Sequence, residues 1–242
     1  MGSHLDKYFK ISIIFLGAMF VNCKDSTKDL SKTTSKINPQ IQDTLCPKKH
    51  EVCVAFNDNE GNKLFTLFEK KTTSEIFDEI EEEISNIENT ELFVKLYKND
   101  QLTVKVYDKI DCYTDGYVNY IKDSFSITDL DKDGIKETSF LYILNCDAEP
   151  MPSKMKLIMI EGEQKYKIRG EQSFLNSSEI PKFSIDNSFK KAPVAFLDFS
   201  VKLWNQNIFD PTMKSSSTEQ ERQTQLEMII QKNIETKNSF IE

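Results

Sequence analysis

Histidine is scarce in this sequence, which contains only His4 and His50. Metal sites and Ser-His-Asp or Cys-His catalytic groups that depend on histidine therefore have almost no residues to use. A mechanism based on histidine would have to use His50, which lies in the charged run CPKKHEVC with no nucleophile motif beside it. We therefore do not expect chemistry of this kind.

Long apolar runs are also missing. The apolar stretch near the start, residues 11–21, has eleven residues, whereas a membrane-spanning helix needs about twenty. Lys7 and Lys10 precede it, and a basic segment before a short apolar run is typical of a secretory signal. The chain is therefore expected to be exported rather than to span a membrane.

Cys23 follows this apolar run directly and is itself followed by the polar sequence KDS. The arrangement resembles a bacterial lipoprotein signal, in which the cysteine becomes the lipidated first residue of the mature chain. We expect lipid on Cys23 to anchor the chain to the outer membrane or cell surface. The alternative is ordinary signal cleavage that leaves Cys23 as a free thiol.

Basic residues are fewer than acidic ones, 31 against 39, which gives a formal net charge of −8. Removal of residues 1–22, with Asp6, Lys7 and Lys10, would bring it to about −9. A nucleic-acid partner is not expected, since binding requires a basic surface. The chain is nevertheless 38% hydrophobic and 29% charged, which predicts a packed core.

Four cysteines remain beyond Cys23, and an even number in an exported chain favours disulfides. We favour the pairs Cys46–Cys53 and Cys112–Cys146, the second of which flanks an acidic stretch described below. A zinc site is not indicated, because no two cysteines have the C-x-x-C spacing. Free buried thiols remain the alternative.

Hairpin patterns dominate the middle of the chain. Residues 51–70 and 91–110 each contain two apolar-rich runs around a polar turn, and residues 155–169 repeat the pattern around Gly162. Residues 117–128 and 138–146 are predicted strands on either side of the acidic stretch.

Three segments are predicted to be helical. Ile76, Ile80, Ile84 and Ile87 would share one face of a helix over residues 72–89, with Thr72 and Glu75 spaced as a capping box. Residues 192–209 are expected to form a buried helix that starts near Pro193, and residues 218–235 a more polar one.

The predicted fold class is α+β: a mainly antiparallel sheet built from hairpins, with a few helices packed on it. We divide the chain into a signal peptide (1–22), a flexible tether rich in Ser, Thr and Lys (23–44), an α+β domain (45–210), and a C-terminal linker with its helix (211–242).

The stretch DLDKDGIKET, residues 129–138, places acids at alternate positions before a glycine. Counted from Asp129, the acids occupy positions 1, 3, 5 and 9, and Gly134 occupies position 6. Calcium takes about six to eight oxygen ligands from carboxylates, carbonyls and water. We predict a structural calcium site whose ligands are Asp129, Asp131, Asp133, the carbonyl of Ile135, and Glu137.

This loop is not an EF-hand, because its position 12 is Phe140 rather than glutamate. The pattern D-x-D-x-D-G-x-x-[DE] between strands resembles the calcium loops of integrin-type β-repeat proteins. The alternative is a turn whose carboxylates are only solvated. A catalytic metal is disfavoured, since it would need an open coordination position and a partner base.

Residues 120–207 resemble a wider family. The runs ITDLDKDGIKETSFLYILNC, MKLIMIEGEQKYKIRG and SFKKAPVAFLDFSVKLWN are similar to the DLDxDGIxE loop, the following hairpin and the FLDFxVKLW helix of exported Bacteroidota proteins described as surface polysaccharide biosynthesis proteins. The resemblance implies a role connected with cell-surface glycan and supplies no catalytic residues.

The expected function is therefore that of a non-catalytic cell-surface or periplasmic lipoprotein with a structural calcium loop and a polysaccharide or surface-protein partner. The alternative is an enzyme that acts on surface polysaccharide through paired carboxylates. Tyr113, Tyr117, Tyr120 and Trp204 could then stack on sugars, although packing is the favoured role for each.

Overall fold

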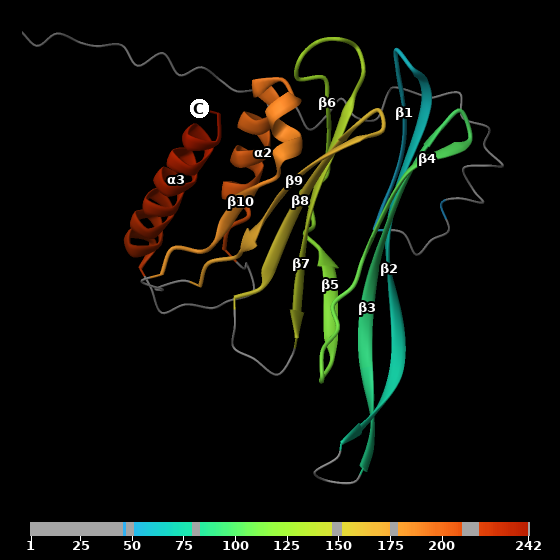
Figure 1. The fold of residues 1–242 in the computed structure, drawn as a ribbon, viewed down its shortest axis with the longest axis vertical. Helices are drawn as coiled ribbons and strands as arrows, with labels where there is room; N and C mark the ends of the chain where they lie inside the picture. Colours follow the sequence, from blue (N-terminus) through green and yellow to red (C-terminus); the bar gives the residue numbers. More distant parts are fainter. Residues whose placement is uncertain are drawn as a thin grey trace, which may run out of the picture. The chain divides into compact units, whose positions relative to one another are not determined.

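A sheet of strands with helices beside it makes up the described part of the chain (Figure 1). The structure is a computed structural model that describes Cys46 and residues 51–78, 83–146, 152–174, 179–209 and 218–241. The strands are β1 (Val52–Asp58), β2 (Gly61–Asp78), β3 (Glu83–Lys98), β4 (Gln101–Asp108), β5 (Gly116–Tyr120), β6 (Ser126–Thr128), β7 (Glu137–Cys146), β8 (Lys154–Glu161), β9 (Gln164–Glu171) and β10 (Phe183–Ile185). The helices are α2 (Val194–Gln206) and α3 (Glu219–Ile241), and a 3-10 helix, Asn187–Lys191, precedes α2.

The strands form one sheet in the order β1-β2-β3-β5-β7-β8-β9-β10. β4 pairs with β3 and β6 pairs with β7, outside this order. The described strands pair antiparallel except β3 and β5, which are joined by the parallel pair Asn89↔Gly116. The predicted α+β class, an antiparallel sheet with a few helices on it, is confirmed.

Two cores hold three layers together (Figure 1). The first core lies between β1–β4 and β5, β7 and β8, where Phe65 of β2 meets Phe140 of β7 with ring centroids 5.6 Å apart. The second lies on the other face of β7–β9, against the helices, and includes the fully buried Leu157 and Trp204. Alternation of apolar residues in the strands produces both cores, because successive side chains point to opposite faces.

The hairpin predictions agree with the observed pairings β1–β2, β3–β4 and β8–β9. The β3–β4 hairpin contains a register shift that leaves Thr103 without a partner residue on β3. Leu102 pairs with Tyr97, and its side chain is exposed. An extra residue in one strand reverses which face the following side chains occupy.

The helix predicted for residues 72–89 is wrong. Residues 72–78 belong to β2 and residues 83–89 to β3, and the two strands pair in register from Lys63↔Lys98 to Asp78↔Glu83. Ile76 lies in β2, whereas Ile84 and Ile87 lie in β3, so the repeat that resembles one face of a helix is divided between two strands. The β-branched Thr and Ile residues favour the strand, and the Thr72 hydroxyl donates to the carbonyl of Asn89 on the partner strand.

Two other boundaries differ from the prediction. The strand expected over residues 117–128 is interrupted between β5 and β6, where Asp123 has a φ of 66° and the Ser124 hydroxyl donates to the carbonyl of Ile121. The C-terminal helix begins near the expected residue but continues to Ile241, and Thr218 and Glu221 cap it reciprocally.

The turn between β1 and β2 contains a buried ion pair. Lys63 Nζ lies 2.6 Å from Asp58 Oδ2 and 2.7 Å from Glu60 Oε2. The Lys63 and Asp58 side chains are only 1% and 0% exposed. Asp58 Oδ2 also accepts a hydrogen bond from the backbone N–H of Lys136, so this pair connects the β1–β2 turn to the acidic loop.

We predict that Lys63→Met destabilises the protein by about 3–5 kcal/mol, because it leaves Asp58 buried without its cation. Urea unfolding followed by circular dichroism measures the change. Lys71→Met is the matched control, since Lys71 pairs with Glu88 at 3.7 Å on the exposed surface and should leave the midpoint nearly unchanged. Equal shifts for the two variants would contradict the structural role of the buried pair.

Candidate metal centre

The acidic loop connects β6 to β7 and is folded by its own aspartates. Asp131 Oδ1 accepts a hydrogen bond from the N–H of Asp133 at 3.3 Å, and Asp133 Oδ1 accepts one from Ile135 at 2.7 Å. Asp129 Oδ1 accepts a longer one from the N–H of Gly134, at 3.4 Å. Each aspartate therefore closes a short turn ahead of it, a local geometry to which this residue type is well suited.

Gly134 allows the loop to reverse beside the β1–β2 turn. Its φ is +84°, a conformation that favours glycine, and a Cβ at this position would collide with the Asn59 side chain. Asn59 holds the reversed loop by two hydrogen bonds, from its N–H to the carbonyl of Gly134 and from Nδ2 to the carbonyl of Asp133, both at 2.9 Å.

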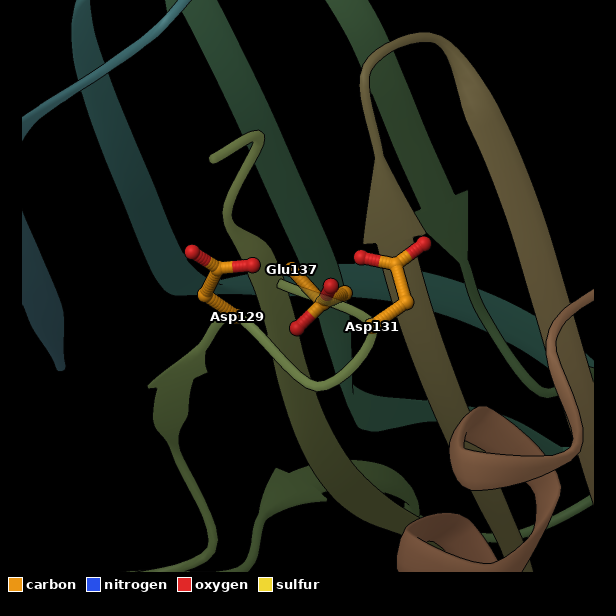
Figure 2. Close-up of side chains that lie close together, drawn as sticks. All are labelled: Asp129, Asp131 and Glu137. Atoms are coloured by element: carbon orange, nitrogen blue, oxygen red, sulfur yellow. The ribbon is translucent and has the colours of Figure 1, made fainter. Parts of the chain in front are cut away.

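The fold collects five carboxylates into two overlapping groups. One group is Asp129, Asp131 and Glu137, and the other is Asp131, Asp133 and Glu161. Within each group, one carboxylate oxygen per residue lies within 4.8 Å of the others. Figure 2 shows Glu137 between Asp129 and Asp131. All four acids predicted from the sequence thus belong to clusters that could hold a metal ion.

Glu137 is the buried member of the first group, with 0% of its surface exposed. Its carboxylate accepts hydrogen bonds from the Thr128 hydroxyl at 2.7 Å and from the N–H of Leu130 at 3.1 Å. Burial raises the pKa of Glu137, and the neighbouring charge of Asp131 adds to the effect. The side chain is held at the base of the loop, where β7 begins.

Glu161, at the end of β8, completes the second group and was not predicted from the sequence. The pairing Thr138↔Ile160 brings the ends of β7 and β8 together, so Glu161 lies beside Glu137. Burial, followed by the charges of Asp131, Asp133 and Glu137, raises the pKa of Glu161 to about 7. The Tyr166 hydroxyl donates to its Oε2 at 3.4 Å, whereas its buried Oε1 meets no donor in the described part of the chain.

The chemistry of this donor set suits a hard cation. Every ligand in the two groups is a carboxylate oxygen, and oxygen ligands are those that calcium and magnesium prefer. A cation would neutralise the repulsion that raises the pKa of Glu161, and it would give Glu161 Oε1 a partner. The sequence contained one clue to this residue: a glutamate that directly ends the apolar run MKLIMI.

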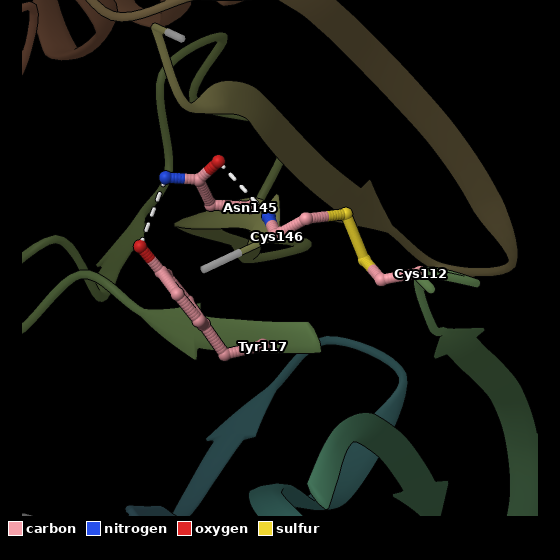
Figure 3. The surroundings of a disulfide bond; sticks show 4 residues. All are labelled: Cys112, Tyr117, Asn145 and Cys146. Atoms are coloured by element: carbon pink, nitrogen blue, oxygen red, sulfur yellow. Dashed lines mark hydrogen bonds between the residues drawn. A yellow bond between two sulfur atoms is a disulfide. The ribbon is translucent and has the colours of Figure 1, made fainter. Parts of the chain in front are cut away.

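Disulfides join Cys46 to Cys53 and Cys112 to Cys146, each with a Cα–Cα distance of 5.9 Å. These are the two pairs favoured from the sequence. Figure 3 shows the second, beside which Asn145 Nδ2 donates to the Tyr117 hydroxyl at 2.9 Å. It fastens the connection between β4 and β5 to the end of β7.

The remaining candidate residues are Cys23, His50 and the aromatic side chains considered for sugar stacking. Cys23 and His50 lie outside the described residues. Trp204 is fully buried and makes an edge contact with Phe183, so packing accounts for it. Tyr113 is exposed, and the Tyr120 hydroxyl accepts a hydrogen bond from the N–H of Phe125.

Among the residues that the structure describes, no helix is long and apolar enough to cross a membrane. Comparisons with known protein families, with curated proteins and with solved structures find no significant match to this chain.

We predict that Glu161→Gln stabilises the protein when excess EDTA is present at pH 8. The folded-state pKa of Glu161 is raised from 4.5 to about 7, so between these values the folded protein keeps a proton that the unfolded chain releases. Stability then falls as pH rises through this window, and a neutral glutamine removes the penalty. The melting temperature (Tm) of the variant should exceed that of the wild type at pH 8 and match it near pH 4.5.

Glu163→Gln is the control for this experiment, because Glu163 is exposed in the turn that follows Glu161. It should behave as the wild type does at both pH values. A lower Tm for Glu161→Gln than for the wild type at pH 8 in EDTA would contradict the proposed repulsion.

Proposed function

We propose that the acidic loop binds one calcium ion that stabilises the sheet, and that the protein is a non-catalytic exported lipoprotein. The observation that carries the proposal is the convergence of two carboxylate groups that share Asp131, with the buried Glu161 Oε1 among them. Asp129, Asp131, Asp133, the carbonyl of Ile135, and Glu137 would be ligands, and Glu161 would add a sixth.

Calcium is favoured over other ions by the type and number of these ligands. The two groups contain no histidine or cysteine, which transition metals would favour. Magnesium requires near-ideal octahedral geometry and retains several waters, whereas calcium accepts about six to eight oxygens in a flexible arrangement. A donor set drawn from a loop and a neighbouring strand suits the more flexible ion.

The position of the loop supports a structural role. Its backbone is hydrogen-bonded to Asn59 in the β1–β2 turn and to Asp58 at the end of β1. Glu137 begins β7 in the middle of the sheet. An ion bound here would join the two strand layers. A catalytic ion would instead keep a coordination position open for substrate.

We predict that calcium raises the Tm of the full chain and that EDTA reverses the effect. At 100 times the Kd, a ligand that binds only the folded state contributes about 2.7 kcal/mol, which corresponds to roughly 5–10 °C for a chain of this size. Asp131→Ala should abolish the response, because Asp131 belongs to both groups.

Asp111→Ala is the matched control, since Asp111 is exposed and pairs only with Lys109 among the described residues. It should keep the full calcium response. A wild-type Tm that is the same in calcium and in EDTA would overturn the proposed site.

The cellular setting is part of the same proposal. Two disulfides are compatible with an exported protein, and the sequence around Cys23 resembles a lipoprotein signal. Lipid on Cys23 would hold the chain at the outer membrane or cell surface. The resemblance of residues 120–207 to surface polysaccharide biosynthesis proteins supports a role in that process, with a polysaccharide or a surface protein as partner.

One observation favours the second candidate, an enzyme that acts on surface polysaccharide. A cavity of about 720 Å³ lies between β2, β5 and the helices, and both Glu51 and Glu69 line it. Burial raises the pKa of Glu69, which accepts a hydrogen bond from the N–H of Tyr120. A carboxyl group with a raised pKa beside a second carboxylate is the minimum that glycoside hydrolysis needs.

Complementation of a deletion strain separates the two candidates. If the protein is non-catalytic, Glu69→Gln should restore surface glycan as well as the wild type does, because glutamine keeps the oxygen that accepts from Tyr120. An enzyme that uses Glu69 would lose function by at least about a hundredfold. Surface glycan measured in both strains decides between these outcomes.

A further inference from the structure

A basic cavity of about 210 Å³ lies between the outer edge of β4 and one face of β8 and β9. It is smaller than the roughly 300–1,000 Å³ of sites for drug-sized ligands, so it suits a small chemical group. Its lining contains five basic side chains and one carboxylate, namely Lys105, Lys156, Lys165, Lys167, Arg169 and Asp108. This balance is the reverse of that of the whole chain, whose net charge is −8.

Strand register explains how the basic residues come together. Lys165, Lys167 and Arg169 alternate along β9 and therefore point to one face. The pairing Lys156↔Arg169 places Lys156 of β8 on that face too. The edge of β4 approaches the same face, and Lys165 Nζ lies 3.5 Å from the carbonyl oxygen of Lys105.

Only part of this positive charge is neutralised within the described residues. Lys156 pairs with Asp108, which also accepts a hydrogen bond from the Tyr142 hydroxyl, and Arg169 pairs with Asp186. Lys105, Lys165 and Lys167 form no ion pair in the described ranges. Three positive charges that line one cavity repel one another, and an anion bound among them would be attracted to all three.

We propose that this cavity binds a phosphate or sulfate group. Such a tetrahedral oxyanion carries up to two charges and several acceptor oxygens, and the ammonium groups of lysine serve as flexible point charges with three donors each. Lys165 and Lys167 supply the main attraction and Lys105 closes the cavity from β4. The site does not depend on the calcium proposal, because it shares no residue with the acidic loop.

Isothermal titration of the full chain with sodium sulfate, at constant ionic strength set by sodium chloride, tests the site. Sulfate is the first probe because it remains soluble with millimolar calcium; inorganic phosphate and glycerol 3-phosphate follow in calcium-free buffer. Saturable one-to-one binding is expected. Preference for inorganic phosphate would indicate a free ion as ligand, and preference for glycerol 3-phosphate an esterified phosphate.

The double variant Lys165→Gln/Lys167→Gln should weaken sulfate binding at least about tenfold, because it removes two charges next to the ion. The matched control is Lys70→Gln/Lys202→Gln, which removes the same charge from exposed positions outside the cavity. General stabilisation of the folded state by excluded sulfate acts on all variants alike. The test of the site is therefore the difference in sulfate affinity between the two double variants.

Two results would overturn the proposal: absence of saturable binding to the wild type, or equal affinities for the two double variants. The lysines would then serve only to keep the edge of β4 from pairing with another chain, a common role for charge at sheet edges. If the double variant fails to fold, Lys105→Gln at an exposed position of β4 tests the same cavity. Its affinity should fall by a smaller factor, and an unchanged affinity would again overturn the site.

Discussion

Repulsion among five carboxylates is the constraint around which one end of the sheet is built. Asp129, Asp131, Asp133, Glu137 and Glu161 converge there from a loop and two strands. Hydrogen bonds within the loop and from Thr128 offset part of the repulsion, yet the pKa of Glu161 remains raised to about 7. These groups could hold a metal ion, and in the proposed site a bound cation would replace the repulsion with attraction.

The β1–β2 turn connects the acidic loop to the strand layer formed by β1–β4. Asp58 lies between the cation of Lys63 and the backbone of Lys136, and Asn59 holds the reversed end of the loop. The buried ion pair and the acidic loop are therefore parts of one polar network between otherwise apolar layers. Such networks stabilise a fold only when every member has a partner. Glu161 Oε1 is buried and has no hydrogen-bond partner among the described residues, so it marks the place in the network where a ligand would fit.

Much of this arrangement follows from the sequence, because local patterns determine it. Alternation around polar turns predicted the hairpins, and the spacing of the acids predicted the loop. The helix predicted at residues 72–89 is wrong because its isoleucine repeat is divided between β2, which contains Ile76, and β3, which contains Ile84 and Ile87. Glu161 and the basic cavity could not be predicted, since their neighbours come from strands whose register no short segment specifies.

The contact between Asn59 and Asp133 joins residues 74 positions apart, whereas each hairpin joins neighbours along the chain. Contacts of large sequence separation carry a greater cost in chain entropy and limit folding rates. We infer that the hairpins form first and that docking of the loop onto the β1–β2 turn comes late. At the proposed site, an ion that requires the docked loop would act after the folding barrier, and it would lengthen the lifetime of the native state rather than hasten its formation.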